Sequence, residues 1–550
     1  MTKRMLDRRH SLITDENSRW WTLGAMCFAL FMIMLDNTVV NVALPSIQRD
    51  LHASLSALEW TVNAYTLTFA VLLVTGGRLG DIFGRRRMFL FGVAVFGIAS
   101  AAIGFAPSDN ALVAFRAVQG IGAAFMMPAT LSLITQAFPP HQRGTAIGTW
   151  AGVSALALAI GPVLGGFLTQ QVSWRAIFFI NPPIAVIAVA VTLFAARESR
   201  DETVSRKVDF PGIASITIGL TAIVLALVQG NAWGWGSARI EALLGTAALA
   251  IVAFIQIERR TAAPMVDFNF FRSRTFLGAN LVALVVSFAM LAQFFFLALY
   301  MQNILHYSPL QTGVRFLPAT LVIIVMGPLS GRLTDKVGPR LPMTAGLLTV
   351  ALALFIQSHV TIHTGYGLLL PGFVLMGLGM GLTMSPMSTA AMNAVDRTKA
   401  GVASGVLAMS RMVGGTFGVA VIGALVTAIG KSKLDQGLPH VSAATRSAIA
   451  NALGSGAVPA HAGAHVAAVT REAFVSALGT GLTIGSSVTL AGAFVALALI
   501  QRTASRPAAA PAERETTPDG IPAERPATPA GAHLAGEGGG AESAGELTLI

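Results

Sequence analysis

The sequence predicts an all-α membrane protein in which two related bundles of six helices flank two additional helices. Three observations support this fold class: long apolar segments recur along the chain, one ten-residue motif occurs twice, and basic residues are concentrated in alternate connections. Of the 550 residues, 54% are hydrophobic and only 11% are charged, whereas soluble proteins carry about a quarter charged residues. Most of the chain is therefore expected to face lipid or a membrane-buried interior.

Fourteen apolar segments are long enough, at about 18 or more residues, to cross a bilayer as helices. The segment at 240–257 is short, and the one at 276–303 is long enough to tilt. The predicted helices are 21–45, 57–77, 88–106, 111–136, 144–168, 176–196, 210–230, 240–257, 276–303, 311–331, 341–360, 366–387, 401–429 and 478–501.

The basic residues assign the connections to the two sides of the membrane. One set of alternate connections is rich in Arg and Lys, as at Arg85, Arg86 and Arg87, whereas the opposite set holds few outside one long segment at 430–477. Because cytoplasmic loops carry the excess of basic residues, we expect both termini in the cytoplasm and a multi-pass protein of the cell (inner or plasma) membrane. The formal net charge of +11 then reflects topology, and we expect no nucleic acid among the partners.

These assignments divide the chain into five parts. A cytoplasmic N-terminal segment (1–20) has no signal-peptide pattern. An N-terminal six-helix bundle (21–196) precedes a linker with the two extra helices (197–275) and a C-terminal bundle (276–501). Within the last, we expect an extracytoplasmic loop at 430–477 whose residues 445–453 and 466–478 form short amphipathic helices on the outer face. The tail (502–550) is rich in Pro, Ala, Gly and Glu and is predicted to be disordered.

The composition and motifs exclude several kinds of site. Cys27 is the single cysteine, which rules out a disulfide within the chain and a cysteine-based metal site. His440, His461 and His465 lack the short spacing of metal ligands. Nucleotide-binding, zinc-protease and nucleophile-elbow motifs are missing from the sequence. We therefore expect no enzyme activity, no metal and no cofactor, and any transport must draw on an ion gradient or on the gradient of the substrate.

The repeated motif is Gly-Arg-Leu-x-Asp-x-x-Gly-x-Arg, at 77–86 and again at 331–340. Each copy lies between two apolar segments, and two-fold internal repeats are typical of secondary transporters. In the first copy, Asp81 can accept backbone N–H groups at a helix N-terminus, where the helix dipole favours negative charge. Asp335 is its counterpart in the second copy.

Asp36 lies deep in the first predicted helix, where a charge is costly and indicates a role in a cavity. One interpretation is that Asp36 binds a proton and a cationic substrate in competition, since burial favours the neutral acid and a bound cation favours the ionised one. The alternative is a permanent ion pair that joins two helices. Arg116 lies at comparable depth and is the expected partner, and Gln119, at i+3 on the same face, would orient it.

Five segments then occur in a known order. They are Leu35–Pro45, Gly77–Arg86, Arg116–Gly122, Gly161–Gly166 and Trp174–Pro183. Together they resemble the major facilitator superfamily, and more closely its fourteen-helix drug:proton antiporter family, over roughly residues 20–501. The resemblance implies alternating access between two bundles, proton coupling through Arg116, and two added helices outside the transport path.

The resemblance also implies gating roles. Asp81 would contact the helix that begins near Gly401 and lock an outward-open state, and Asp335 would contact the helix near Gly144. The gating residues are Gly77, Asp81, Gly84, Arg85, Arg86, Gly161, Pro162, Gly165, Gly166, Asp335 and Arg340. Candidates for the substrate cavity are Asn37, Asn41, Trp60, Asn63, Tyr65, Phe295, Tyr300 and Gln302. We interpret Arg315 as snorkelling toward the membrane surface and Arg411 as structural, and expect neither to bind substrate.

The predicted function is a proton-coupled multidrug efflux transporter for lipophilic, monocationic compounds. The resemblance implies that exporters of dications in this family have a second acid in helix 10. The predicted helix 311–331 holds no acidic residue, so efficient export of dications is not expected. The partners would be drug-like small molecules, protons, membrane lipids and, in a two-membrane cell, a periplasmic adaptor. An exporter dedicated to one metabolite or antibiotic is the alternative, and a non-transporting membrane sensor or scaffold is the alternative from another class.

Overall fold

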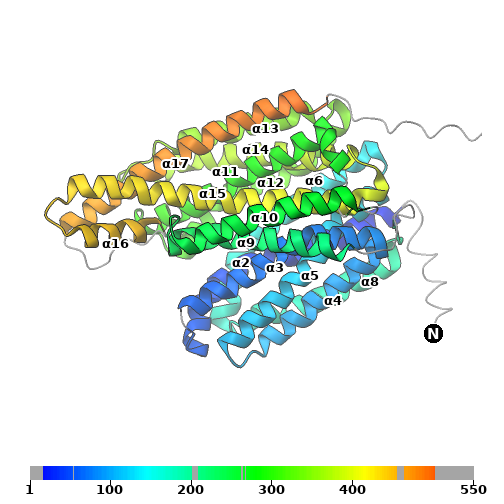
Figure 1. The fold of residues 1–550 in the computed structure, drawn as a ribbon, viewed down its shortest axis with the longest axis horizontal. Helices are drawn as coiled ribbons and strands as arrows, with labels where there is room; N and C mark the ends of the chain where they lie inside the picture. Colours follow the sequence, from blue (N-terminus) through cyan, green and yellow to red (C-terminus); the bar gives the residue numbers. More distant parts are fainter. Residues whose placement is uncertain are drawn as a thin grey trace, which may run out of the picture. The chain divides into compact units, whose positions relative to one another are not determined.

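A computed structural model describes residues 17–53, 55–200, 209–261, 264, 266, 268–454 and 464–501, and the regular structure of these residues is helical (Figure 1). The chain divides into two units, Met1–Ser505 and Arg506–Ile550. The second unit, most of the tail predicted to be disordered, lies outside the described residues. So do His461, most of the N-terminal segment 1–20 and residues 201–208 of the linker.

Helices occupy every apolar segment predicted from the sequence. The N-terminal half contains α2 (Ser18–Leu51), α3 (Leu55–Phe83), α4 (Arg85–Gly104), α5 (Asp109–Ala137), α6 (Arg143–Gln171), α7 (Ala176–Phe179) and α8 (Asn181–Ala195). The central pair is α9 (Phe210–Trp233) and α10 (Ala238–Arg260). The C-terminal half contains α11 (Arg274–Asn303), α12 (Pro309–Val337), α13 (Arg340–Gln357), α14 (Tyr366–Asn393), α15 (Ala400–Gly437), α16 (Ala443–Gly454) and α17 (Ala464–Leu499).

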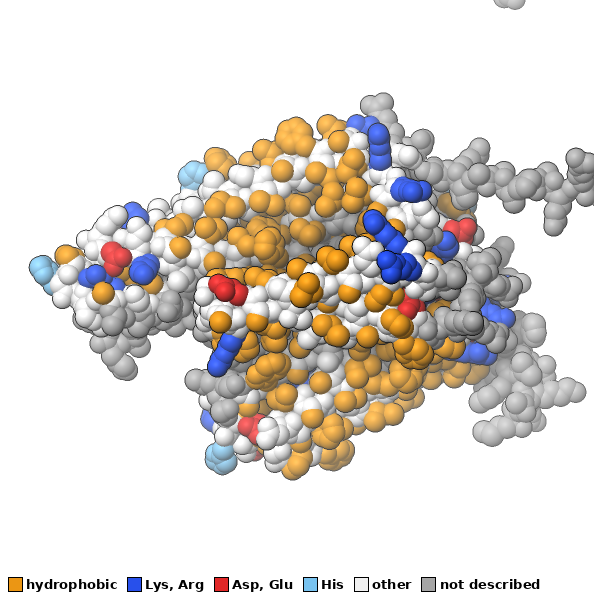
Figure 2. Space-filling view, in the orientation of Figure 1, with side chains coloured by type: hydrophobic (Ala, Val, Ile, Leu, Met, Phe, Trp, Pro, Cys, Tyr) orange, Lys and Arg blue, Asp and Glu red, His pale blue; other side chains and the backbone are white. Residues whose placement is uncertain are grey.

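Thirteen of the helices in the described residues are long and apolar enough to cross a membrane. Each coincides with a predicted span. The remaining predicted span, 144–168, coincides with the 29-residue α6, some of whose side chains lie outside the description, so the total of fourteen stays a prediction. Hydrophobic side chains cover the middle of the molecule and basic ones lie toward its ends (Figure 2), as expected of a surface in contact with lipid.

Local sequence explains where several of these helices begin. Ser108, Ser237 and Ser273 each accept a hydrogen bond from a backbone N–H in the first turn of α5, α10 and α11, respectively. Ser308 forms a reciprocal capping box with Gln311 at the start of α12. These caps satisfy N–H groups that a helix leaves unpaired at its first turn, which matters most where water is scarce.

The two halves meet along two helix pairs, α3 with α15 and α6 with α12. Both pairs approach most closely at the end of the bundle where α3 and α12 terminate and α6 and α15 begin; we call this the latch end. A Cβ atom added to Gly77 would come closer than 3.0 Å to the carbonyl oxygen of Gly401, and one added to Gly331 would meet that of Gly144 in the same way. Only glycine therefore permits this backbone-to-backbone contact.

The central pair α9–α10 lies to one side of these contacts. α9 packs against α3 and α15, and α10 packs mainly on α9. Much of α10 is exposed, including Leu249 at 75%, which fits a lipid-facing surface. The expectation that these two helices lie outside the transport path stays a prediction.

The segment 430–477 is not the loop that the sequence predicts. α15 continues to Gly437, α16 covers the first predicted short helix, and α17 begins at Ala464 and runs unbroken through the second into the last span. Ala473, Phe474, Val475, Ala477 and Leu478 are all buried, because the apolar face of the span continues through them. At about 1.5 Å per residue, the 36 residues of α17 exceed the thickness of a bilayer core, and α15–α17 extend beyond the other helices (Figure 1).

Replacing Gly77 by Ala is expected to shift the molecule away from the state in which the latch end is closed, because the new methyl group displaces α15. Spin labels at Phe83 and Leu333, exposed residues near the latch end of the two halves, would report this as a longer distance in a Cys27→Ser background. Gly245→Ala is the matched control, since a Cβ there meets no atom within 4 Å. Equal distance distributions in the two variants would contradict the role given to Gly77.

Candidate functional site

Asp36 and Arg116 form a buried ion pair between α2 and α5. The Nη1 atom of Arg116 lies 2.5 Å from Oδ2 of Asp36 and also donates to Oε1 of Gln119 at 2.7 Å. Gln119 in turn donates to Oδ1 of Asp36 at 3.0 Å. The exposed fractions of the three residues are 3%, 1% and 0%. The structure thus brings together the three residues expected to couple proton and substrate.

Residues from three more helices complete this site. Asn181, at the start of α8, donates to Oδ1 of Asp36 at 3.2 Å and to the hydroxyl of Ser100 in α4 at 2.9 Å. The Nε atom of Arg116 donates to the carbonyl oxygen of Thr61 at 3.0 Å, and its guanidinium stacks on the ring of Tyr65, 4.2 Å from the centroid. Four helices of one half, α2, α3, α5 and α8, therefore supply Asp36, Arg116 or a residue in direct contact with one of them.

This arrangement determines what the carboxylate can do. Both oxygens of Asp36 accept hydrogen bonds from residues of its own half. A cationic ligand that binds the carboxylate competes with Arg116 and the two amides. Since removing one partner of a buried pair leaves an uncompensated charge, protonation of Asp36 would release Arg116 as well.

The two copies of the repeated motif form two contacts between the halves. Asp81 accepts hydrogen bonds from the backbone N–H groups of Gly401 at 2.9 Å and Val402 at 2.8 Å, at the start of α15. Asp335 accepts from the N–H groups of Gly144 at 2.9 Å and Thr145 at 3.0 Å, at the start of α6, and from the Thr145 hydroxyl at 2.9 Å. Each carboxylate thus caps a helix of the opposite half, where the dipole favours it.

The two contacts differ at one motif position that bears on the carboxylate. Arg85 binds Oδ1 of Asp81 through Nε at 2.9 Å and Nη2 at 2.6 Å, and also donates to the carbonyl oxygen of Thr398. The second copy has Pro339 at the equivalent position, and no ion pair to Asp335 is present among the described residues. The first contact is therefore charge-assisted and the second relies on neutral donors.

The other predicted gating residues shape the backbone. Gly84 and Gly338 occupy the same motif position, and both have positive φ angles, 110° and 83°, which favour glycine. Arg86 donates to the carboxylate of Glu198 and to the carbonyl oxygen of Leu193. Arg340 begins α13.

Glycines of α6 allow close packing within the N-terminal half. A Cβ atom at Gly161 would overlap the hydroxyl of Thr38 in α2, and one at Gly165 would press on Val39. Gly166 lies in the same helix, and Pro162 is described only as helical backbone.

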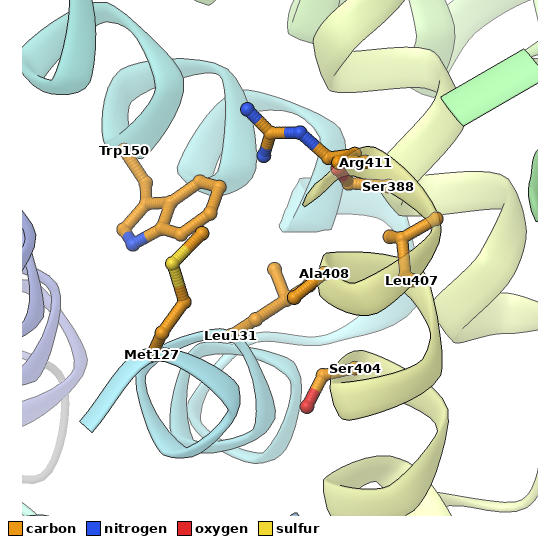
Figure 3. A pocket seen from close by; sticks show the side chains of 8 residues that line it. All are labelled: Met127, Leu131, Trp150, Ser388, Ser404, Leu407, Ala408 and Arg411. Atoms are coloured by element: carbon orange, nitrogen blue, oxygen red, sulfur yellow. The ribbon is translucent and has the colours of Figure 1, made fainter. Parts of the chain in front are cut away.

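A narrow space lies between the halves (Figure 3). The non-atom space within it is about 250 Å³, including space open to its surroundings, and in this state it has room for little more than a water-sized group. It is lined by Met127, Leu131, Trp150, Ser388, Ser404, Leu407, Ala408 and Arg411.

None of the cavity residues expected from the sequence lines this space. Tyr65 is occupied by Arg116, and Asn37 donates to the backbone of its own helix. Tyr300 is buried. Its hydroxyl donates to the carbonyl oxygens of Thr361 and Thr364 and so fixes the connection between α13 and α14. Phe295 is 41% exposed and packs on its neighbour Phe296. Trp60, Asn63 and Gln302 are partly buried elsewhere, and Asn41 is described only as helical backbone.

The two remaining arginines of the spans lie in different settings. Arg315 stacks on Tyr307 at 3.7 Å and donates to the carbonyl oxygen of Gln311, near the start of α12. Arg411 lines the space in Figure 3, and the expectation that it is structural stays a prediction. The sequence analysis did not predict Asn181 or Trp150 as site residues. The position of Asn181 directly before two prolines in a span was a signal that could have identified it.

Trp174 and Arg175 belong to a cluster of polar contacts at the surface. Asp50 accepts a 2.9 Å hydrogen bond from the indole of Trp174 and forms an ion pair with Arg175. These two contacts hold the pKa of the Asp50 carboxyl below its usual value. The cluster ties the end of α2 to the segment that leads into α8.

No group of three or more possible metal ligands occurs among the described residues. His440 and His465 lie on either side of α16 in the sequence, and His465 is in the first turn of α17.

Comparison with known proteins gives consistent results. The family model of the Major Facilitator Superfamily matches residues 26–419. The tetracenomycin C resistance and export protein of Streptomyces glaucescens is 38% identical over 80% of this chain and 83% of its own length. The multidrug resistance protein Stp of Mycobacterium tuberculosis is 36% identical over 77% and 78%. The puromycin resistance protein pur8 of Streptomyces alboniger is 38% identical over 74% and 82%.

Solved structures share the fold. A double-Trp mutant of XylE superposes with a TM-score of 0.59 over 88% of this chain and 96% of its own, at 13% identity. The human organic anion transporter MFSD10 gives 0.57 over 87% and 99%, at 14% identity. At these identities the likeness concerns the fold alone.

Asp81→Asn is expected to lower the free energy of unfolding by about 3–5 kcal/mol, because it leaves the buried guanidinium of Arg85 without its anion. Asp335→Asn should cost less, about 1–3 kcal/mol, since its carboxylate holds no arginine and an amide oxygen can replace one acceptor. Chemical unfolding of the two purified variants in the same detergent measures the difference. Equal losses would show that Arg85 adds nothing to the first contact.

Proposed function

The chain belongs to the Major Facilitator Superfamily, and on that premise we propose that it exports small lipophilic compounds across the membrane in exchange for protons. The observation that supports this most directly is the buried carboxylate of Asp36, held by Arg116, Gln119 and Asn181 within one half. Intramembrane acids mark proton and substrate pathways. Relatives named for antibiotic resistance and export at 36–38% identity support the direction of transport and the drug-like substrates.

The positions of the charges support an orientation. The latch end carries the basic connections, including Arg85, Arg86 and Arg87, and basic residues are retained on the cytoplasmic side. The latch end is then cytoplasmic, and the far end, from which α15–α17 extend, is extracytoplasmic. With both carboxylate contacts made, the structure corresponds to a state closed toward the cytoplasm.

The coupling follows from the contacts of Asp36. In the state described here its ionised carboxylate is satisfied by Arg116 and two amides. A proton that enters from the outer side neutralises Asp36 and frees the guanidinium, which changes how α5 packs on α2. Opening at the cytoplasmic side then requires that the contacts of Asp81 and Asp335 break. Release of the proton restores the pair, and one charge that crosses 100 mV supplies about 2.3 kcal/mol.

A dedicated exporter of one metabolite or antibiotic uses the same machinery and differs only in its range of substrates. The relatives named for tetracenomycin C and for multidrug resistance support each version equally. A non-transporting sensor or scaffold would not need the paired contacts between halves. Drugs, protons and membrane lipids are the proposed partners, and a periplasmic adaptor is added where the cell has two membranes.

Asp36→Asn is expected to reduce proton-dependent efflux to the level of cells without the transporter, because the carboxamide cannot take up and release a proton. Efflux of a fluorescent substrate is measured with and without an uncoupler. Asp36→Glu keeps the acid and should retain part of the activity, and Asp109→Asn, which changes an acid at the start of α5, should behave as wild type. Uncoupler-sensitive efflux by Asp36→Asn at the wild-type rate would refute the coupling role.

A further inference from the structure

The space between the halves contains an unpaired cation. Arg411 extends from α15 into this space, where apolar side chains such as Met127 and Leu131 lie around it (Figure 3). Its side chain is partly buried and adjoins the space. It makes no hydrogen bond or ion pair with the residues that the structure describes.

Three carboxylates within the bundle are compensated. Asp36 pairs with Arg116, and Asp81 pairs with Arg85. Asp335 is satisfied by N–H groups and a hydroxyl. A cation in such surroundings without a partner is costly, so a charge of the opposite sign is the missing component of this site.

The position of Arg411 agrees with a substrate site. It lies 11 residues into α15, which starts at Ala400 at the latch end, or about 16 Å along the helix axis at 1.5 Å per residue. This depth is close to the middle of a bilayer core. Transporter substrates bind near the midplane between the two repeats, and the lining residues come from both halves.

The remaining lining residues indicate the rest of the ligand. Ser388 is buried and, among the described residues, has no hydrogen-bond partner, so its hydroxyl is available beside Arg411. Trp150 supplies a large aromatic surface and is itself 3% exposed. A guanidinium binds carboxylate-like groups through two parallel N–H donors, while apolar and aromatic walls favour a hydrophobic body.

We propose that Arg411 selects lipophilic monoanions, such as aromatic compounds with a carboxylate or an acidic enol or phenol, as the substrates of this transporter. This inference rests on the proposed export function and differs from the monocationic substrates expected from the sequence. The difference arises because the carboxylate of Asp36 is fully occupied by its own half and lies outside the lining of this space, whereas the guanidinium of Arg411 faces it.

The test uses three probes that share one ring system: pyrenebutyrate, pyrenebutanol and pyrenebutylamine. Equilibrium binding to the purified full-length protein in detergent is followed by pyrene fluorescence at one fixed pH. The wild-type protein is expected to bind the anion most tightly and the cation most weakly. Equal affinities, or tighter binding of the amine, would overturn the proposal without any variant.

Variants then assign the preference to one residue. Arg411→Gln should weaken binding of pyrenebutyrate at least about tenfold, since a charge-assisted hydrogen bond is lost, and should leave pyrenebutanol unchanged. Arg411→Lys keeps the charge and should restore part of the affinity. Arg315→Gln, at an arginine stacked on Tyr307 away from this space, is the matched control. An unchanged affinity of Arg411→Gln for the anion would also overturn the proposal.

The same probes separate this inference from the export function. Proteoliposomes with and without a pH gradient measure uptake of the three compounds by wild type. Anion-selective binding without gradient-driven transport would refute proton-coupled export and leave the anion site standing. Gradient-driven transport that is selective for the amine would refute the anion site and leave export standing.

Discussion

The carboxylate of Asp81 lies against the first turn of α15, a helix of the opposite half, and the arrangement of the two halves depends on this contact and its counterpart at Asp335. Two backbone N–H groups that the helix cannot satisfy internally receive a full negative charge. The contact forms only because Gly77 and Gly401 let the two backbones approach. A single repeated motif thereby supplies the turn, the anion and the space that the joint between halves requires.

The interior separates two kinds of charge. Asp36 and Arg116 neutralise each other inside one half, where Arg116 donates to Oδ2 of the carboxylate and two amides donate to Oδ1. Arg411 remains uncompensated where the halves meet. The first arrangement suits a proton that enters and leaves without exposing charge to lipid, and the second suits a ligand that brings its own anion. The two sites share α5, which carries Arg116 at one and Met127 and Leu131 at the other, so a proton and a substrate would influence each other through the packing of α5 rather than through one shared carboxylate.

Most of the fold could be predicted from the sequence, because a membrane-spanning helix requires a long apolar segment and such segments are easily recognised. All predicted spans coincide with helices. It was wrong about 430–477, where short apolar stretches broken by polar residues gave no sign that α17 continues from Ala464. For the site, charge in an apolar segment pointed to Asp36 and Arg116, since few partners are available at that depth. The space between halves could not be predicted, because Trp150 and Arg411 come from separate helices and only their crossing places them together.

The seam between α6 and α12 has a mechanical consequence. Gly144, Gly148, Gly327 and Gly331 place backbone directly on backbone, so at these four positions no side chain has to change its rotamer for the helices to separate. The two helices can therefore change their crossing angle while they stay in contact. The two terminal carboxylates then supply most of the resistance to opening. Because their sets of hydrogen-bond donors are unequal, we expect the contact of Asp335 to break before the contact of Asp81.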